Sequence, residues 1–151
     1  MVDWSGVRCG CGGSAGHLGE LLGELVEIDS PERMRMQDPA PHLIGDGAGA
    51  VPPVAPAAVG LMLAALDGGA LLPLVRSLFL RLLAELAVAA PESAECRALL
   101  RAGVPVLLRA GLAGTAEDAI RAAEVCAAYW PSGDEPAFAA WVLLAERAER
   151  G

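Results

Sequence analysis

Residues 70–90 read ALLPLVRSLFLRLLAELAVAA, and this stretch decides the fold class. Four polar positions form one narrow stripe at helical spacing: Arg76, Ser77, Arg81 and Glu85. The pattern predicts a helix over about residues 71–89, and a helix that is apolar on most of its sides is expected to be covered by other helices. Because charged residues interrupt the apolar run, it is too short for a transmembrane helix, which needs about 18 uninterrupted apolar residues.

The composition of the whole chain points the same way. Its 151 residues have the size of one domain, and they include 30 alanines and 23 leucines, which favour helices. The aromatic residues that favour strands make up only 4% of the chain. We therefore expect an all-α fold without a sheet. The four cysteines lack the spacing of a disulfide framework and are expected to be free thiols.

Helix breakers and capping residues divide the chain into about eight predicted helices. Residues 1–13 are expected to be a flexible lead, and residues 14–151 a single domain. A Gly/Pro-rich loop is predicted at residues 45–56. The predicted helices are 15–28 after a Ser14 cap, one from Ser30–Pro31 to Pro39 or Pro41, 56–67, 71–89, 93–103, a sixth opened by Pro105, one capped by Thr115 with Asp118, and one from Ser132 to about Arg147.

Short apolar cores recur along the chain as LGELL (18–22), VGLML (59–63), VPVLL (104–108) and AWVLL (140–144). Their starts lie 41, 45 and 36 residues apart. Helical-hairpin repeats of the HEAT and armadillo type have periods of about 40–47 residues. The sequence therefore predicts a stack of helical hairpins, each of which buries its apolar face against its neighbours.

Longer segments carry a family resemblance. The segments GAVPPVAPAAVGLMLAAL (49–66) and CRALLRAGVPVLLRAGLA (96–113), preceded by DW from Asp3 and followed by YWP, resemble the small HEAT-repeat proteins common in actinobacteria. The resemblance implies an architecture and no defined activity. The chain departs from that family at residues 47–50, where GAGA replaces a frequent His-Gln-Gly-Thr stretch, so no role of those polar side chains is implied.

The charge of the chain restricts its partners. The formal net charge is −8, the isoelectric point is near 4.7, and all 11 basic residues are arginines. Such a chain is repelled by nucleic acid and by anionic membranes, so neither is expected as a partner. The N-terminus shows no charged-then-apolar signal pattern, and we expect a cytoplasmic protein.

The arginines of the middle helices suggest a protein-binding surface. Arginine is frequent among interface anchors and binds carboxylates with two hydrogen bonds. We expect a non-catalytic module that binds a protein or peptide partner, although a solvated face of balanced charge explains the same residues. The candidate binding residues are Arg76, Arg81, Arg97 and Arg101, which are predicted to converge with Arg109 on one face of the stack.

An alternative interpretation is a small-molecule-binding protein or biosynthetic enzyme with a pocket between helices. In that case the loop at residues 45–56 would act as a lid. His42 and Asp46 are its candidate catalytic residues, since a histidine hydrogen-bonded to a carboxylate can act as a general base.

The stretch CGCGGSAGH (9–17) raises the question of a metal site. Cys9, Cys11 and His17 are candidate ligands, and folding could add His42 or Cys96 as a fourth. Structural zinc sites usually show two close ligand pairs, and a Cys-x-Cys with one histidine lacks the second pair. The sequence therefore favours no metal and no cofactor, and a glycine-rich lead into the first helix.

Overall fold

The computed structural model describes residues 3–33, 39–44, 52–89, 93–129 and 133–151. Within these ranges the chain forms eight α-helices, one 3-10 turn at Pro31–Arg33 and no strand, which confirms the all-α prediction. The α-helices are α1 (Gly16–Glu27), α2 (Ala40–Ile44), α3 (Ala55–Gly68), α4 (Pro73–Ala89), α5 (Ala94–Ala102), α6 (Val104–Ala113), α7 (Ala116–Ala127) and α8 (Glu135–Glu149).

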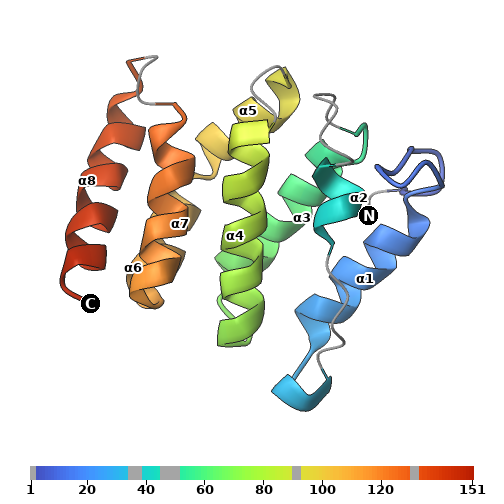
Figure 1. Cartoon of the computed structure of the whole chain (residues 1–151), viewed down its shortest axis with the longest axis horizontal. Coiled ribbons are helices and arrows are strands. Elements are labelled where there is room, and N and C mark those ends of the chain that lie inside the picture. The colour runs from blue at the N-terminus through green and yellow to red at the C-terminus, as the bar shows by residue number, and fades with distance from the viewer. Residues whose placement is uncertain (1–2, 34–38, 45–51, 90–92, 130–132) are drawn as a thin grey trace.

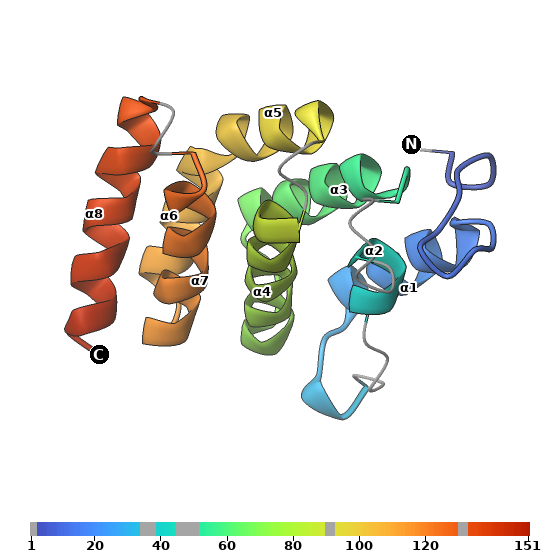
Figure 2. The ribbon, with the colours of Figure 1, turned by 45° about the horizontal axis from the view of Figure 1, so that its top comes forward.

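The helices stack in two rows along the long axis of the molecule (Figure 1). Helices α2, α4 and α7 lie side by side in one row, and α1, α3 and α6 form the row behind it. Helix α8 packs against both α6 and α7 at the C-terminal end, and α5 crosses above α3 and α6 (Figure 2). This arrangement is the predicted stack of helical hairpins.

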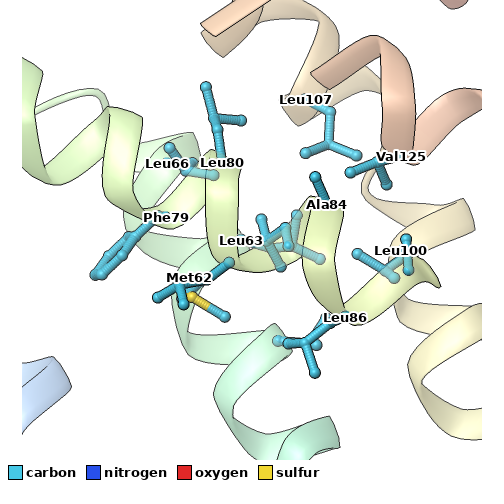
Figure 3. Packing of buried hydrophobic residues seen from close by; sticks show 14 of the residues in the cluster. Met62, Leu63, Leu66, Phe79, Leu80, Ala84, Leu86, Leu100, Leu107 and Val125 are labelled. Atoms are coloured by element: carbon cyan, nitrogen blue, oxygen red, sulfur yellow. The ribbon is translucent and has the colours of Figure 1, made fainter. Parts of the chain in front are cut away.

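Helix α4 lies in the middle of the stack and contributes much of the core. Its buried side chains include Phe79, Leu80, Leu83 and Leu86, all of them 0% exposed. They meet apolar residues of α3, α5, α6 and α7 in one continuous cluster (Figure 3). The apolar composition of residues 71–89 is therefore explained by burial inside protein.

No helix among the described residues has the combination of length and apolar character that crossing a bilayer demands. The longest, α4, has 17 residues and carries Arg76, Arg81 and Glu85.

Several predicted helix ends are confirmed. Thr115 and Asp118 form a reciprocal capping box at the start of α7, in which each side chain accepts a hydrogen bond from the other residue's backbone N–H. Helix α3 ends where Gly69 adopts a left-handed conformation with φ of 69°. Glycine adopts this conformation without steric cost, so Gly68–Gly69 stops the helix as expected.

Other predicted helix ends differ from the structure. The N-cap position of α1 is Ala15, one residue after the predicted Ser14. The Ser14 hydroxyl accepts a hydrogen bond from the N–H of Gly16, the first residue of α1, and donates one to the carbonyl of Ser5. Pro41 lies in the first turn of α2 instead of ending a helix, because the first turn does not need the N–H that proline lacks. The cap of α8 is Asp134, which accepts a hydrogen bond from the backbone N–H of Ala137, and the predicted cap Ser132 lies outside the described residues.

The C-terminal helices approach closely because small residues line their contact. A Cβ atom placed on Gly111 of α6 would lie 2.5 Å from Leu144 of α8 and 2.9 Å from Ala122 of α7. Helix α7 presents buried Ala119 and Ala122 at this junction. Glycine at position 111 therefore lets three helices meet at one point.

Replacing Leu86 by alanine should destabilise the fold, because its fully buried side chain would leave a cavity. We expect a loss of about 2–5 kcal/mol in the free energy of unfolding, measured by urea denaturation. The matched control is Leu74→Ala on the same helix, where the side chain is 53% exposed and the loss should stay below about 1 kcal/mol. Equal losses in the two variants would contradict the assignment of the core.

Candidate functional site

The structure brings together four metal-binding side chains at the N-terminal end of the stack. They come from a turn after the N-terminus (Cys9 and Cys11), the first turn of α1 (His17) and α2 (His42). One ligand atom from each residue lies within 4.8 Å of the others. Cys9 is buried, His42 is half-buried, and Cys11 and His17 are more open to solvent.

Three distances define the centre of this cluster. The Sγ atom of Cys9 lies 3.2 Å from Nδ1 of His42, and the Sγ atom of Cys11 lies 3.5 Å from Nε2 of His17. The two imidazoles meet at 3.1 Å between Nε2 of His17 and Nδ1 of His42. All four groups therefore point toward one small volume rather than away from it.

The backbone around the two cysteines forms a closed turn. The Cys9 N–H donates to the carbonyl of Gly13, and the Gly12 N–H donates to the carbonyl of Cys9. Gly12 has a φ of 89°, in the left-handed region that favours glycine. Arg8 and Ser14 pair as a single antiparallel bridge that closes this turn.

This turn is also joined to α2 and α1, so residues 3–13 fold back onto the domain that was predicted to begin at residue 14. The Gly10 N–H donates to the carbonyl of His42 over 3.0 Å. A Cβ atom on Gly10 would lie 2.7 Å from that same oxygen, so only glycine permits the contact. The ring of Trp4 lies over Gly19 of α1, where a Cβ atom would come within 2.8 Å of it.

The environment of the cluster shifts the pKa values of its groups in different directions. Burial raises the pKa of the Cys9 thiol, whereas a backbone hydrogen bond from Gly13 lowers the pKa of the exposed Cys11 thiol. Burial, with a smaller effect from neighbouring His17, lowers the pKa of His42 and favours its neutral imidazole. Neutral imidazole is the form of histidine that binds metal ions.

His42 therefore has different neighbours from those expected for a general base. Its Nδ1 atom faces Cys9 and His17. The other residue of the predicted pair, Asp46, lies outside the described residues, as does most of the 45–56 loop. The enzyme interpretation stays a prediction.

Two of the four predicted binding arginines form ion pairs with aspartates of other elements. Arg76 of α4 donates from Nε to Asp118 of α7 over 3.3 Å, and Arg101 of α5 donates from Nε to Asp134 over 2.8 Å. Asp118 lies in the first turn of α7 and Asp134 follows its C-terminal end. Because 12 residues of helix span roughly 18 Å, these two arginines are anchored at opposite ends of α7.

The other two predicted binding residues lie on α4 and α5. Arg81 lies beside Glu85 on α4, with 3.9 Å between Nε and Oε1. Arg97 lies on the exposed side of α5. Arg76 and Arg101 serve as ties between helices, a role that the sequence could not separate from partner binding.

Asp118 is the most buried charged residue of the described chain, with 1% of its surface exposed. Its carboxylate accepts hydrogen bonds from the Ser77 hydroxyl at 2.5 Å, from Arg76 and from the backbone N–H of Thr115. These partners compensate the cost of burying a charge. Asp118 therefore joins α4 to the start of α7.

A cavity of about 220 Å³ opens near the C-terminal ends of α3 and α6. Arg76 and Arg109 line it together with Asp67 and apolar side chains of α3 and α6. Arg109 forms an ion pair with Asp67, and both side chains are more than half exposed. The lining of the cavity includes no residue of the Cys/His cluster.

Comparisons of the chain with protein-family models, with curated proteins and with solved structures gave no match.

Replacing Asp118 by alanine should destabilise the protein, because it removes three hydrogen bonds and leaves the half-buried Arg76 without its partner. We expect a loss of about 2–3 kcal/mol in the free energy of unfolding, typical of hydrogen bonds to charged groups. The measurement is urea denaturation followed by circular dichroism.

The neighbouring residue Glu117 provides the control. Its carboxylate is 59% exposed and pairs with Arg121 on the surface of the same helix. Glu117→Ala should change the free energy of unfolding by less than about 1 kcal/mol, since exposed ion pairs contribute little. A larger effect at Glu117 than at Asp118 would be inconsistent with the inter-helix role of Asp118.

Proposed function

We propose that this chain is a non-catalytic module that binds a protein or peptide, built as a HEAT-like stack of helical hairpins. The observation that supports the proposal is an exposed stripe on α4, the central helix of the front row (Figure 1). We define the α4 stripe as Leu74, Arg81, Glu85 and Val88. These positions are seven, four and three residues apart, so they share one face of the helix.

The α4 stripe exposes large apolar side chains at both of its ends. Leu74 is 53% exposed and Val88 is 74% exposed, while Arg81 and Glu85 lie between them. On the adjacent helix α7, Ile120 is 42% exposed. Exposed large apolar side chains are available to contact a partner, and stacked helical repeats commonly bind partners over extended faces.

The dimensions of the α4 stripe suit a short segment of a partner. Leu74 and Val88 are 14 residues apart, which corresponds to roughly 21 Å along the helix. An amphipathic helix of about four turns has the same length and presents apolar anchors at both ends. We therefore favour a peptide or helix of a protein partner, with charged residues of its own opposite Arg81 and Glu85.

The proposal includes two further expectations from the sequence: the chain resembles HEAT-repeat proteins, and it is located in the cytoplasm. The negative net charge supports a partner other than nucleic acid. Of the predicted binding residues, Arg81 belongs to the α4 stripe, and Arg97 stays a candidate at its exposed position on α5.

Replacing Leu74 and Val88 together by aspartate should abolish partner binding without unfolding the chain, because both side chains already face solvent. Partners are captured on the immobilised protein from an extract of the producing cells, and the affinity of each purified partner is then measured by calorimetry. We expect binding to the double variant to weaken at least tenfold.

The control variant is Leu143→Asp on α8, where the side chain is 46% exposed and distant in sequence from the α4 stripe. It should bind the partner within twofold of the unmodified chain. Unchanged affinity in the Leu74/Val88 variant would exclude the α4 stripe as the binding surface.

A further inference from the structure

We propose that Cys9, Cys11, His17 and His42 bind one Zn²⁺ ion in a closed, structural Cys2His2 site. This inference goes beyond the proposed binding function and is independent of it, because the site lies at the N-terminal end of the stack and includes no residue of the α4 stripe. Four observations carry it: the distances, the ligand set, the shape of the turn and the position of the three joined segments.

The distances fit a single tetrahedral ion. With zinc bonds of about 2.3 Å to sulfur and 2.0–2.1 Å to nitrogen, a tetrahedron places sulfur about 3.5 Å from nitrogen and the two nitrogens about 3.3 Å apart. Of the six distances between the four ligand atoms, two sulfur-to-nitrogen distances are 3.2 and 3.5 Å and the nitrogen-to-nitrogen distance is 3.1 Å. The other three lie within 4.8 Å. A central ion would need shifts of a few tenths of an ångström along the first three and of at most about 1.3 Å along the others.

The ligand set selects zinc by its chemistry. Two thiolates and two neutral imidazoles are one of the common ligand sets of structural zinc sites, and two thiolates balance the charge of Zn²⁺. Ca²⁺ and Mg²⁺ prefer oxygen ligands, and among the described residues no carboxylate belongs to this cluster. Four protein ligands leave no open position for a substrate, which indicates a structural role.

Contacts of the backbone hold the two cysteines beside α2. Gly12 allows the tight turn that brings Cys9 and Cys11 together, and Gly10 allows this turn to approach the carbonyl of His42. The glycines of CGCGG thus have specific positions in the turn. A glycine-rich lead without a ligand would not require the contact between Gly10 and α2.

The site joins three segments that are otherwise short. Helix α2 has five residues and α1 has 12, and isolated helices of such lengths are marginal in water. His17 and His42 are 25 residues apart, and the cysteine turn precedes both. A bound ion would cross-link these segments and add its binding free energy to the stability of this end of the fold.

A hydrogen-bonded network of thiols and imidazoles is the competing explanation, since the same distances lie within hydrogen-bond range. The two explanations differ in their response to metal. A hydrogen-bonded network would be stable in a chelator and would bind no stoichiometric ion, whereas the proposed site would bind one ion per chain.

The experiment uses the full chain, purified under reducing conditions without a chelator. Elemental analysis should find one zinc per chain. After zinc is removed, titration with Co²⁺ should produce the visible absorption bands of a tetrahedral site with thiolate ligands, and added Zn²⁺ should abolish them. Chelation should lower the melting temperature of the protein, and zinc should restore it.

Two variants test the assignment of the ligands. Cys11→Ser changes an exposed side chain and so should fold normally, and His42→Ala removes the ligand that α2 contributes. Each should weaken zinc binding at least tenfold and eliminate the response of the melting temperature to zinc. The matched control is Cys96→Ala, which removes a cysteine outside the cluster and should keep one zinc per chain.

Two results would overturn the proposal. The first is a fully reduced, folded chain that takes up no stoichiometric zinc or cobalt at micromolar concentrations of free ion. The second is binding that persists with unchanged affinity in both Cys11→Ser and His42→Ala, which would place the ion elsewhere. Neither result would affect partner binding at the α4 stripe, so this inference and the proposed function fail independently.

Discussion

The structure depends on covering α4, a helix that has too few polar positions to face solvent on more than one side. Its buried residues contact helices of both rows, so the neighbours on each side must be in place before the apolar surface of α4 is removed from water. This requirement explains why the chain builds a stack and not a set of separate hairpins. It also explains why α4 has few polar side chains. Arg76 and Ser77 contact Asp118 of α7, and Arg81 and Glu85 lie at the surface.

Charged residues then determine how the stacked helices are joined. Asp118 and Asp134 are N-terminal residues of α7 and α8, where a carboxylate caps the helix and interacts favourably with its dipole. Each also accepts a hydrogen bond from an arginine of another helix. Arg147 of α8 donates similarly to the carbonyl of Gly114 before α7. One set of polar groups therefore ends helices and links them, which leaves fewer arginines available for a partner.

The sequence predicts the architecture well because helix periodicity and capping are local properties. Thr115 with Asp118, and Gly68 with Gly69, determine helix ends through contacts within a few residues. The sequence also identifies Cys9, Cys11 and His17 as candidate ligands because they lie close along the chain, but without a second ligand pair it favours no metal. Their convergence with His42 depends on how α2 packs, and no local pattern encodes a contact between residues 25 or more positions apart.

The ion pairs of the arginines could not be predicted from local sequence patterns either. Arg76 and Arg101 have the spacing of surface residues, and their partners Asp118 and Asp134 are more than 30 residues away in sequence. The sequence pattern of a long polar side chain on a helix surface is the same whether the side chain faces solvent or contacts a neighbouring helix. Packing alone decides between the two, because the carboxylate that fixes the guanidinium comes from another hairpin.

The two ends of the helical stack are packed differently. At the C-terminal end, α8 has 15 residues and packs on both α6 and α7, close enough that Gly111 cannot carry a side chain. At the N-terminal end, α1 has 12 residues and buries three leucines, whereas α2 has five residues and buries one side chain, Leu43. A metal cross-link between α1, α2 and the cysteine turn stabilises this end without a larger core, because its binding free energy is gained only in the folded chain, where the four ligands converge. The ion would therefore join the short α2, which buries little of its own surface, to α1 and to the cysteine turn.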